Sequence, residues 1–231
     1  MAERQMEILV EYPGGQLTFC YDLPGDWDQR SEQQQTKAIQ GWTVQLLPPE
    51  LVGTHVGAAR SHTTGRVAFD SFRMITALFG HAGIEQDLAR CSPEELARLT
   101  AWSALYRELR PLLHTGRTVR ADLEDEARLL HGVVAQDGSR ALYSLARVAS
   151  SPEGQSGRMP LPGLSPDAHY RLRVRTELGL PSFHQVAAPP WVTAAQEDWL
   201  PLPGSVPAVA GLPMPTLDPE QALLIEVRRV D

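Results

Sequence analysis

Residues 92–116, SPEELARLTAWSALYRELRPLLHTG, hold the signals of one long amphipathic helix. Ser92 can cap the first turn, and Pro93 stands where a missing N–H costs nothing. The two glutamates that follow favour the positive end of the helix dipole, and Gly116 supplies a stop. One face of this helix holds the apolar residues Leu96, Leu99, Trp102, Leu105, Leu109 and Leu112. The spacing therefore predicts a helix packed along one side.

Two apolar stretches precede this helix. Residues 51–59 read as a short strand of small and β-branched residues. Residues 67–72 lead through Arg73 into residues 74–79, and this run is apolar on both faces and closes at Gly80. Such a run is typical of a buried parallel strand. A strand followed by an amphipathic helix is one β/α unit, so the sequence predicts β/α units of an α/β barrel.

The segments nearest the amino terminus carry weaker signals. Residues 6–10 and 17–23 flank a Pro-Gly-Gly turn and predict a hairpin. A helical pattern then runs from Ser31 until Pro48 stops it.

After Gly116 the pattern changes to short strands. Residues 129–135 and 141–148 flank the turn Asp137-Gly138, a strong hairpin signal because Asp-Gly supplies the positive φ angles of tight turns. Further short runs follow at 159–161, 170–175 and 223–230, divided by turns rich in proline and glycine. This succession predicts an antiparallel β-sandwich.

Within residues 170–175 three arginines alternate with Leu172 and Val174, which predicts one wet face and one packed face. The fold class expected is thus α/β plus all-β. Residues 1–30 stay unassigned, residues 31–118 form the incomplete end of a (β/α)8 barrel, and residues 119–231 form the sandwich.

Composition excludes several function classes. The 231 residues include 42% hydrophobic and 21% charged residues, as in an ordinary globular protein. A net charge of -7 argues against nucleic acid as a partner. Cys20 and Cys91 have no metal-ligand spacing and are interpreted as two thiols in a reducing compartment. No signal peptide or membrane-spanning run is evident, so we expect no membrane partner and a cytoplasmic location.

Several segments resemble bacterial alpha-galactosidases (melibiases) of glycoside hydrolase family thirty-six. Residues 38–51, AIQGWTVQLLPPEL, resemble the stretch after the family's acid/base region. Residues 53–66 resemble its penultimate barrel strand and loop, and residues 77–88, ALFGHAGIEQDL, its last barrel strand. Residues 163–171 and 211–224 resemble segments of its terminal sandwich. The order and spacing of the series indicate the family more strongly than any one motif does.

The resemblance implies a retaining glycosidase acting on terminal α-galactosides such as raffinose and melibiose, with two carboxylates, water and no cofactor. The family's nucleophile lies in a Lys-Trp-Asp motif, which this sequence lacks. Its acid/base aspartate matches Gln29, and Asp28 stands one residue off register as the single catalytic candidate. A solvated loop acid is the alternative interpretation of Asp28. A complete barrel also needs about 250 residues. We therefore expect a fragment that is inactive alone.

Other polar and aromatic residues receive plainer interpretations. His55 and His62 are placed at the barrel mouth and expected to bond loop backbone, and Arg66 is expected to brace the loop through a carboxylate. For Glu85 and Asp87 we expect bonds to backbone amides rather than a catalytic role. The tryptophans are assigned to the helix core (Trp102) and to the sandwich edge or a sugar ring (Trp191 and Trp199).

Two other functions stay open. The chain is alternatively a non-catalytic module that binds carbohydrate or mediates assembly, including as a homo-oligomer. It is also interpretable as a complementing half that needs a separate amino-terminal chain, because isolated buried-type strands expose apolar surface.

Overall fold

The structure is a computed structural model that describes residues 5–12, 15–22, 47–60, 65, 67–151, 153–184 and 187–230. Between residues 5 and 22 the backbone alone is described. There β1 (Gln5–Tyr12) and β2 (Gly15–Asp22) pair antiparallel, which confirms the predicted hairpin. The helix expected from Ser31 lies outside the described residues for most of its length.

Two parallel strands form the first layer. A short 3-10 helix, η2 (Pro49–Leu51), leads into β3 (Gly53–Gly57), which pairs in parallel with β4 (His81–Glu85). The predicted strand over 51–59 is therefore confirmed, as is the strand within 77–88. Parallel neighbours require a crossover connection, and here the crossover is a helix, so β3 and β4 belong to β/α units.

The predicted parallel strand over residues 67–79 is wrong. Residues 70–78 form the helix α2 (Asp70–Leu78), in which every residue from Ser71 to Leu78 is buried. Because the helix is buried, its apolar run resembles that of a buried strand, and the pair Asp70 and Arg73, three residues apart on one side, was the overlooked sign of a helix. The hydroxyl of Thr54 on β3 donates to the carbonyl of Ala77 at 2.6 Å and ties this helix to the strand pair.

The long helix is confirmed as α3 (Pro93–Thr115). Ser92 and Glu95 form a reciprocal capping box, with Glu95 N–H donating to Ser92 Oγ at 3.2 Å and Ser92 N–H to Glu95 Oε2 at 2.8 Å. Trp102 lies in the core, as expected, and its indole N–H donates to the Met74 carbonyl of α2 at 2.9 Å. This bond fixes α3 against α2.

The chain after α3 forms one antiparallel sheet of six strands in the order β10-β9-β12-β7-β6-β5. Its members are β5 (Arg117–Arg120), β6 (Arg128–Val134), β7 (Arg140–Arg147), β9 (His169–Arg175), β10 (Leu200–Pro203) and β12 (Gln221–Arg229). The predicted hairpin at Asp137-Gly138 is confirmed as β6 and β7, with Gly138 at a φ of 71°.

A smaller layer covers one face of this sheet. It consists of the strand pair β8 (Arg158–Met159) and β11 (Leu212–Pro213), the helix α4 (Pro190–Glu197) and a π-helical turn, η4 (Val206–Ala210). Tyr143, Leu172 and Ile225 of the large sheet share a core with Trp191 and Leu212 of this layer. The fold thus ends in antiparallel sheet packed on a second layer.

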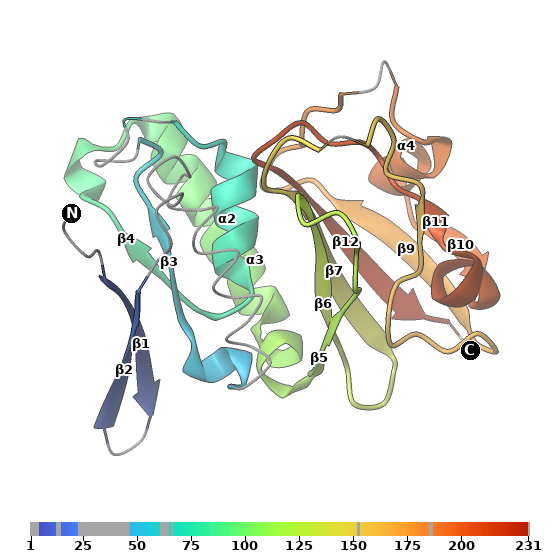
Figure 1. The fold of residues 1–231 in the computed structure, drawn as a ribbon, viewed down its shortest axis with the longest axis horizontal. Helices are drawn as coiled ribbons and strands as arrows, with labels where there is room; N and C mark the ends of the chain where they lie inside the picture. The colour runs from blue at the N-terminus through green and yellow to red at the C-terminus, as the bar shows by residue number, and fades with distance from the viewer. Residues whose placement is uncertain are drawn as a thin grey trace.

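The opposite face of the large sheet packs on α2 and α3, which lie between it and the parallel pair (Figure 1). Leu142 and Leu224 of the sheet share one core with Leu78 and Leu109 of the helices. Gly116 permits this approach, since a Cβ there would lie 2.4 Å from Val133 Cγ1. The two halves of the chain are therefore joined by apolar packing.

Candidate functional site

The carboxyl ends of β3 and β4 form the end at which α/β barrels place their active sites. Gly57 and Glu85 end the two strands in register. His55 Nδ1 lies 3.6 Å from Glu85 Oε2, and these side chains are 50% and 76% exposed. The structure thus brings together two of the residues singled out in the sequence. Glu85 faces a histidine, whereas the sequence predicted a backbone amide.

A buried ionic group holds this end of β3. Arg73 is 2% exposed, and its guanidinium donates to the carbonyl of Gly57. It also donates to Asp70 Oδ1 from Nε at 3.0 Å and from Nη2 at 2.6 Å. Asp70 in turn pairs with Arg98 of α3. These contacts fix the end of β3 against both helices. In the sequence, the only sign of this buried group was a single arginine, Arg73, within an apolar run.

The remaining predicted residues fall into two groups. Asp87 Oδ1 accepts the N–H of Ala89 at 3.0 Å and caps the turn η3 (Leu88–Arg90), so its predicted bond to backbone is confirmed. The others are Asp28, Gln29, His62 and Arg66, and they lie outside the described residues.

A second polar group lies on the large sheet, on the face that carries the helices. Glu226 of β12 is fully buried and its carboxylate accepts from four arginines. These are Arg140, Arg173, Arg175 and Arg228. The prediction that the arginines of residues 170–175 form a wet face is therefore wrong for Arg175, which is 5% exposed. A lone carboxylate inside an apolar strand was the signal that the sequence offered.

Charge pairing decides the protonation of this group. Burial alone would raise the pKa of Glu226, but the hydrogen bond from Arg175 and the charge of Arg140 outweigh it and lower the pKa to about 2. The hydrogen bond from Arg175 likewise lowers the pKa of Glu108 on α3. Both carboxylates are thus charged at neutral pH.

The two edge tryptophans differ. Trp191 is buried, and its indole N–H donates to the Pro213 carbonyl at 2.7 Å, so it covers the sheet as predicted. Trp199 carries the guanidinium groups of Arg171, Arg173 and Arg228, with Cζ atoms 4.7, 4.7 and 4.9 Å from its ring centroid. Its ring is therefore stacked on arginine within the protein.

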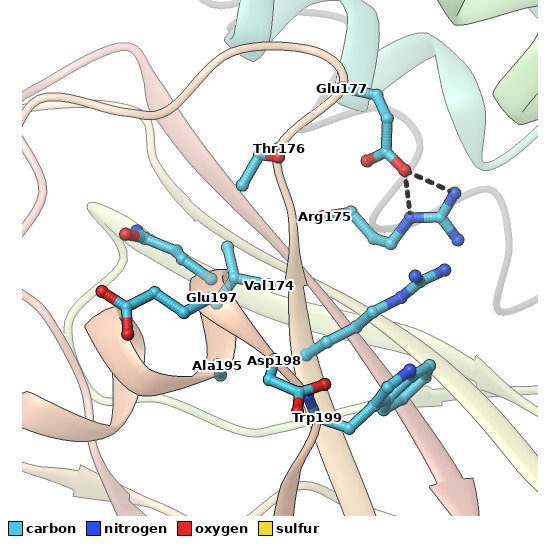
Figure 2. A pocket seen from close by; sticks show the side chains of 10 residues that line it. Val174, Arg175, Thr176, Glu177, Ala195, Glu197, Asp198 and Trp199 are labelled. Atoms are coloured by element: carbon cyan, nitrogen blue, oxygen red, sulfur yellow. Dashed lines mark hydrogen bonds and ion pairs between the residues drawn. The ribbon is translucent and has the colours of Figure 1, made fainter.

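Trp199 also lines a polar pocket of about 220 Å³ between β9 and the end of α4. Figure 2 shows Arg175 paired with Glu177 on one side of this pocket and Glu197 pointing away from the indole on the other. Arginines and carboxylates thus face the same small volume. Among the described residues no group of three His, Cys, Asp or Glu side chains is arranged to hold a metal ion.

The described side chains give little basis for glycoside hydrolysis by themselves. Retaining hydrolysis needs one carboxylate as nucleophile and one carboxylic acid as proton donor on either side of the bond. At the strand ends Glu85 lies beside His55, and Asp87 bonds to a helical turn. Cys91 is a free, half-buried thiol that contacts Gln86. Among the described residues, the carboxylates at the strand ends are thus engaged with His55 or with backbone.

Residues 18–116 match the melibiase family. The alpha-galactosidase of Escherichia coli is 34% identical over 205 residues, which cover 83% of this chain and 28% of that protein. The crystal structure of the alpha-galactosidase AgaA from Geobacillus stearothermophilus, a member of glycoside hydrolase family thirty-six, superposes with a TM-score of 0.69 at 22% identity. That superposition covers 86% of this chain and 25% of AgaA. This chain belongs to the melibiase family.

A second solved alpha-galactosidase matches nearly the same share of this chain. The alpha-galactosidase from Lactobacillus brevis also superposes with a TM-score of 0.69, at 22% identity over 87% of this chain and 25% of the other. This chain therefore spans between a quarter and three tenths of these alpha-galactosidases and corresponds to their carboxy-terminal portion. In the described part of the chain, none of the helices has the length and apolar character needed to span a bilayer.

Proposed function

We propose that this chain supplies the carboxy-terminal part of an alpha-galactosidase that cleaves terminal α-galactosides with retention. The observation that carries the proposal is the 34% identity over 205 residues to the alpha-galactosidase of Escherichia coli. The substrate class follows by analogy, since one AgaA variant was crystallised with raffinose and another with stachyose. The domain division near residue 118 is part of the same proposal.

The nucleophile would come from residues outside this sequence. The family's Lys-Trp-Asp motif is absent here, since the one lysine, Lys37, is followed by Ala38. Asp28 is the candidate acid/base within the chain, one residue from the matching position. The chain itself would contribute part of the barrel wall through β3 and β4 and a sheet that buries the backs of α2 and α3.

Exposed apolar surface supports a missing neighbour at the strand ends. Among the described residues β3 and β4 pair with each other alone. Large apolar side chains near their carboxyl ends are exposed, including Val67 at 57%, Phe69 at 56% and Leu88 at 47%. Unpaired edges beside apolar side chains are typical of surfaces that another polypeptide covers. This favours the complementing half over a free-standing sugar-binding module.

Co-expression tests the proposal. The chain would be produced together with the Escherichia coli alpha-galactosidase truncated before the region that matches it. We expect hydrolysis of a nitrophenyl α-galactoside by the pair and by neither part alone. Phe69→Glu should reduce the activity of the pair strongly, whereas Val209→Glu, a 65% exposed control on the sheet half, should not. Equal loss in both variants would contradict the proposed contact surface.

A further inference from the structure

Three arginines stand in one cross-strand row on the large sheet. Arg228 of β12 faces Arg140 of β7 on one side and Arg171 of β9 on the other. Residues that face each other across antiparallel strands project to the same side of a sheet, so these guanidinium groups are neighbours. Like charges in such a row repel each other, and the row needs negative charge to balance it.

The glutamates of the sheet and helix balance part of this charge. Glu226 pairs with Arg140 and Arg228, and Glu108 also lies within 4.0 Å of both. Arg171 makes no ion pair with any carboxylate in the described part of the chain, and its Nε is enclosed without a hydrogen-bond partner. Within the described residues the row therefore ends in a guanidinium group that has no carboxylate partner.

The whole cluster has a positive surplus. Five arginines (Arg140, Arg171, Arg173, Arg175 and Arg228) stand against the three glutamates that pair with them (Glu108, Glu177 and Glu226), an excess of two positive charges among the groups in direct contact, with Glu197 and Asp198 of the adjoining pocket left out of this count. The chain as a whole carries a net charge of -7, so this surplus is local. The side chains of Arg173 and Arg228 are 30% and 35% exposed, which leaves the cluster accessible from solvent.

Trp199 holds the guanidinium groups in place before any ligand arrives. Its ring carries Arg171, Arg173 and Arg228 at 4.7 to 4.9 Å from the centroid. Cation–π contacts of this kind orient the arginine planes and reduce the entropy lost on binding. Because the ring is already stacked on arginine, it is a poor platform for a sugar and a good support for donors.

We propose that this arginine row binds an oxyanion, the phosphate or carboxylate group of a small molecule, through Arg171 and Arg228 beside Trp199. Planar guanidinium groups recognise such oxygens by paired charge-assisted hydrogen bonds. The adjoining pocket is lined by Glu197 and Asp198 but not by Arg171 or Arg228. The anion therefore belongs over the row and not in the pocket. The proposal is independent of alpha-galactosidase activity.

Indole fluorescence and calorimetry of the full chain test the site. Inorganic phosphate and acetate are titrated separately at constant ionic strength, with sodium chloride replaced as each probe is added. A saturable change with phosphate, with acetate or with both supports the site and identifies the preferred oxyanion. A response that sodium chloride reproduces, or no response to either probe, would overturn the proposal.

Variants locate the binding. Arg171→Gln should weaken binding by about tenfold or more, because one charged donor group is lost. Arg107→Gln, which removes an exposed arginine of α3 away from the row, should leave binding unchanged. Trp199→Phe should abolish the fluorescence change while calorimetry still detects heat. Circular dichroism confirms that each variant is folded, and equal binding by wild type and Arg171→Gln would also refute the site.

Discussion

Glu108 of α3 and Arg175 of β9 form a two-pronged ion pair between the helical layer and the large sheet, with Nη1–Oε1 at 2.9 Å and Nη2–Oε2 at 2.7 Å. Arg175 also donates to the buried Glu226 at 2.7 Å. The helix that belongs to the parallel-strand half is thus bonded to the centre of the antiparallel half. Apolar packing around Leu109 and Leu142 supports the same junction.

Glu226→Gln should destabilise the chain at neutral pH by about 3–5 kcal/mol, because four arginines would lose the buried carboxylate that they share. Urea unfolding at pH 7 measures the change. Glu177→Gln is the matched control, since Glu177 is 40% exposed and pairs with the same Arg175. It should cost no more than about 1 kcal/mol. Similar losses in both variants would disprove the special weight given to Glu226.

Acid should weaken the fold through the same carboxylate. The pKa of Glu226 is lowered from 4.5 to about 2 in the folded chain, so its contribution is complete above pH 4.5 and is lost as the pH falls towards 2. A shift of this size corresponds to about 3 kcal/mol. Urea midpoints measured from pH 6 downwards should fall more steeply for the wild type than for Glu226→Gln. If the urea midpoints of the wild type and of Glu226→Gln fell in parallel with pH, the acid sensitivity would not come from Glu226.

His114 should give a second pH dependence, nearer neutrality. Burial lowers the pKa of His114 below 6.5, although a hydrogen bond with the backbone of Gly80 acts in the opposite direction. A folded state that disfavours protonation is fully stable above the unfolded pKa and loses stability as the pH falls through it. Thermal unfolding between about pH 8 and pH 5 should therefore show a slope that His114→Gln reduces. His184→Gln, at a 70% exposed histidine, should keep the slope.

Gly116→Ala should destabilise the junction by crowding. The added Cβ would lie 2.4 Å from Val133 Cγ1, 2.8 Å from the Leu112 carbonyl and 2.9 Å from the Val134 carbonyl. Overpacking of this kind costs about 1–3 kcal/mol. Gly154→Ala, where nothing lies within 4 Å of the new atom, should change the unfolding free energy by less than about 0.5 kcal/mol. Equal values for the two would show that the junction can relax.

The elements that the sequence predicted correctly have local signals. Ser92, Pro93 and Glu95 define the start of α3 within four residues, and Asp137-Gly138 defines the turn between β6 and β7. Such signals need no knowledge of the rest of the chain. The resemblance of residues 77–88 to a barrel strand located β4 in the same way.

The features that the sequence missed depend on distant partners. The helix α2 is buried between the strand pair and the sheet, so its long apolar run was taken for a buried strand, although Asp70 and Arg73 share one side of it at helical spacing. Glu226 meets Arg140 from 86 residues away and Arg175 from 51 residues away. Only folding brings these charges together, and the pairing of Arg73 with the end of β3 is of the same kind.

Hydrolysis of a nitrophenyl α-galactoside by the purified chain tests the central claim most directly. The claim is that this melibiase-family chain provides scaffold and lacks the catalytic nucleophile. We predict no release of nitrophenol above the buffer rate, because the Lys-Trp-Asp motif is absent from the 231 residues. Release at a specific activity that stays constant through repeated purification would contradict the account.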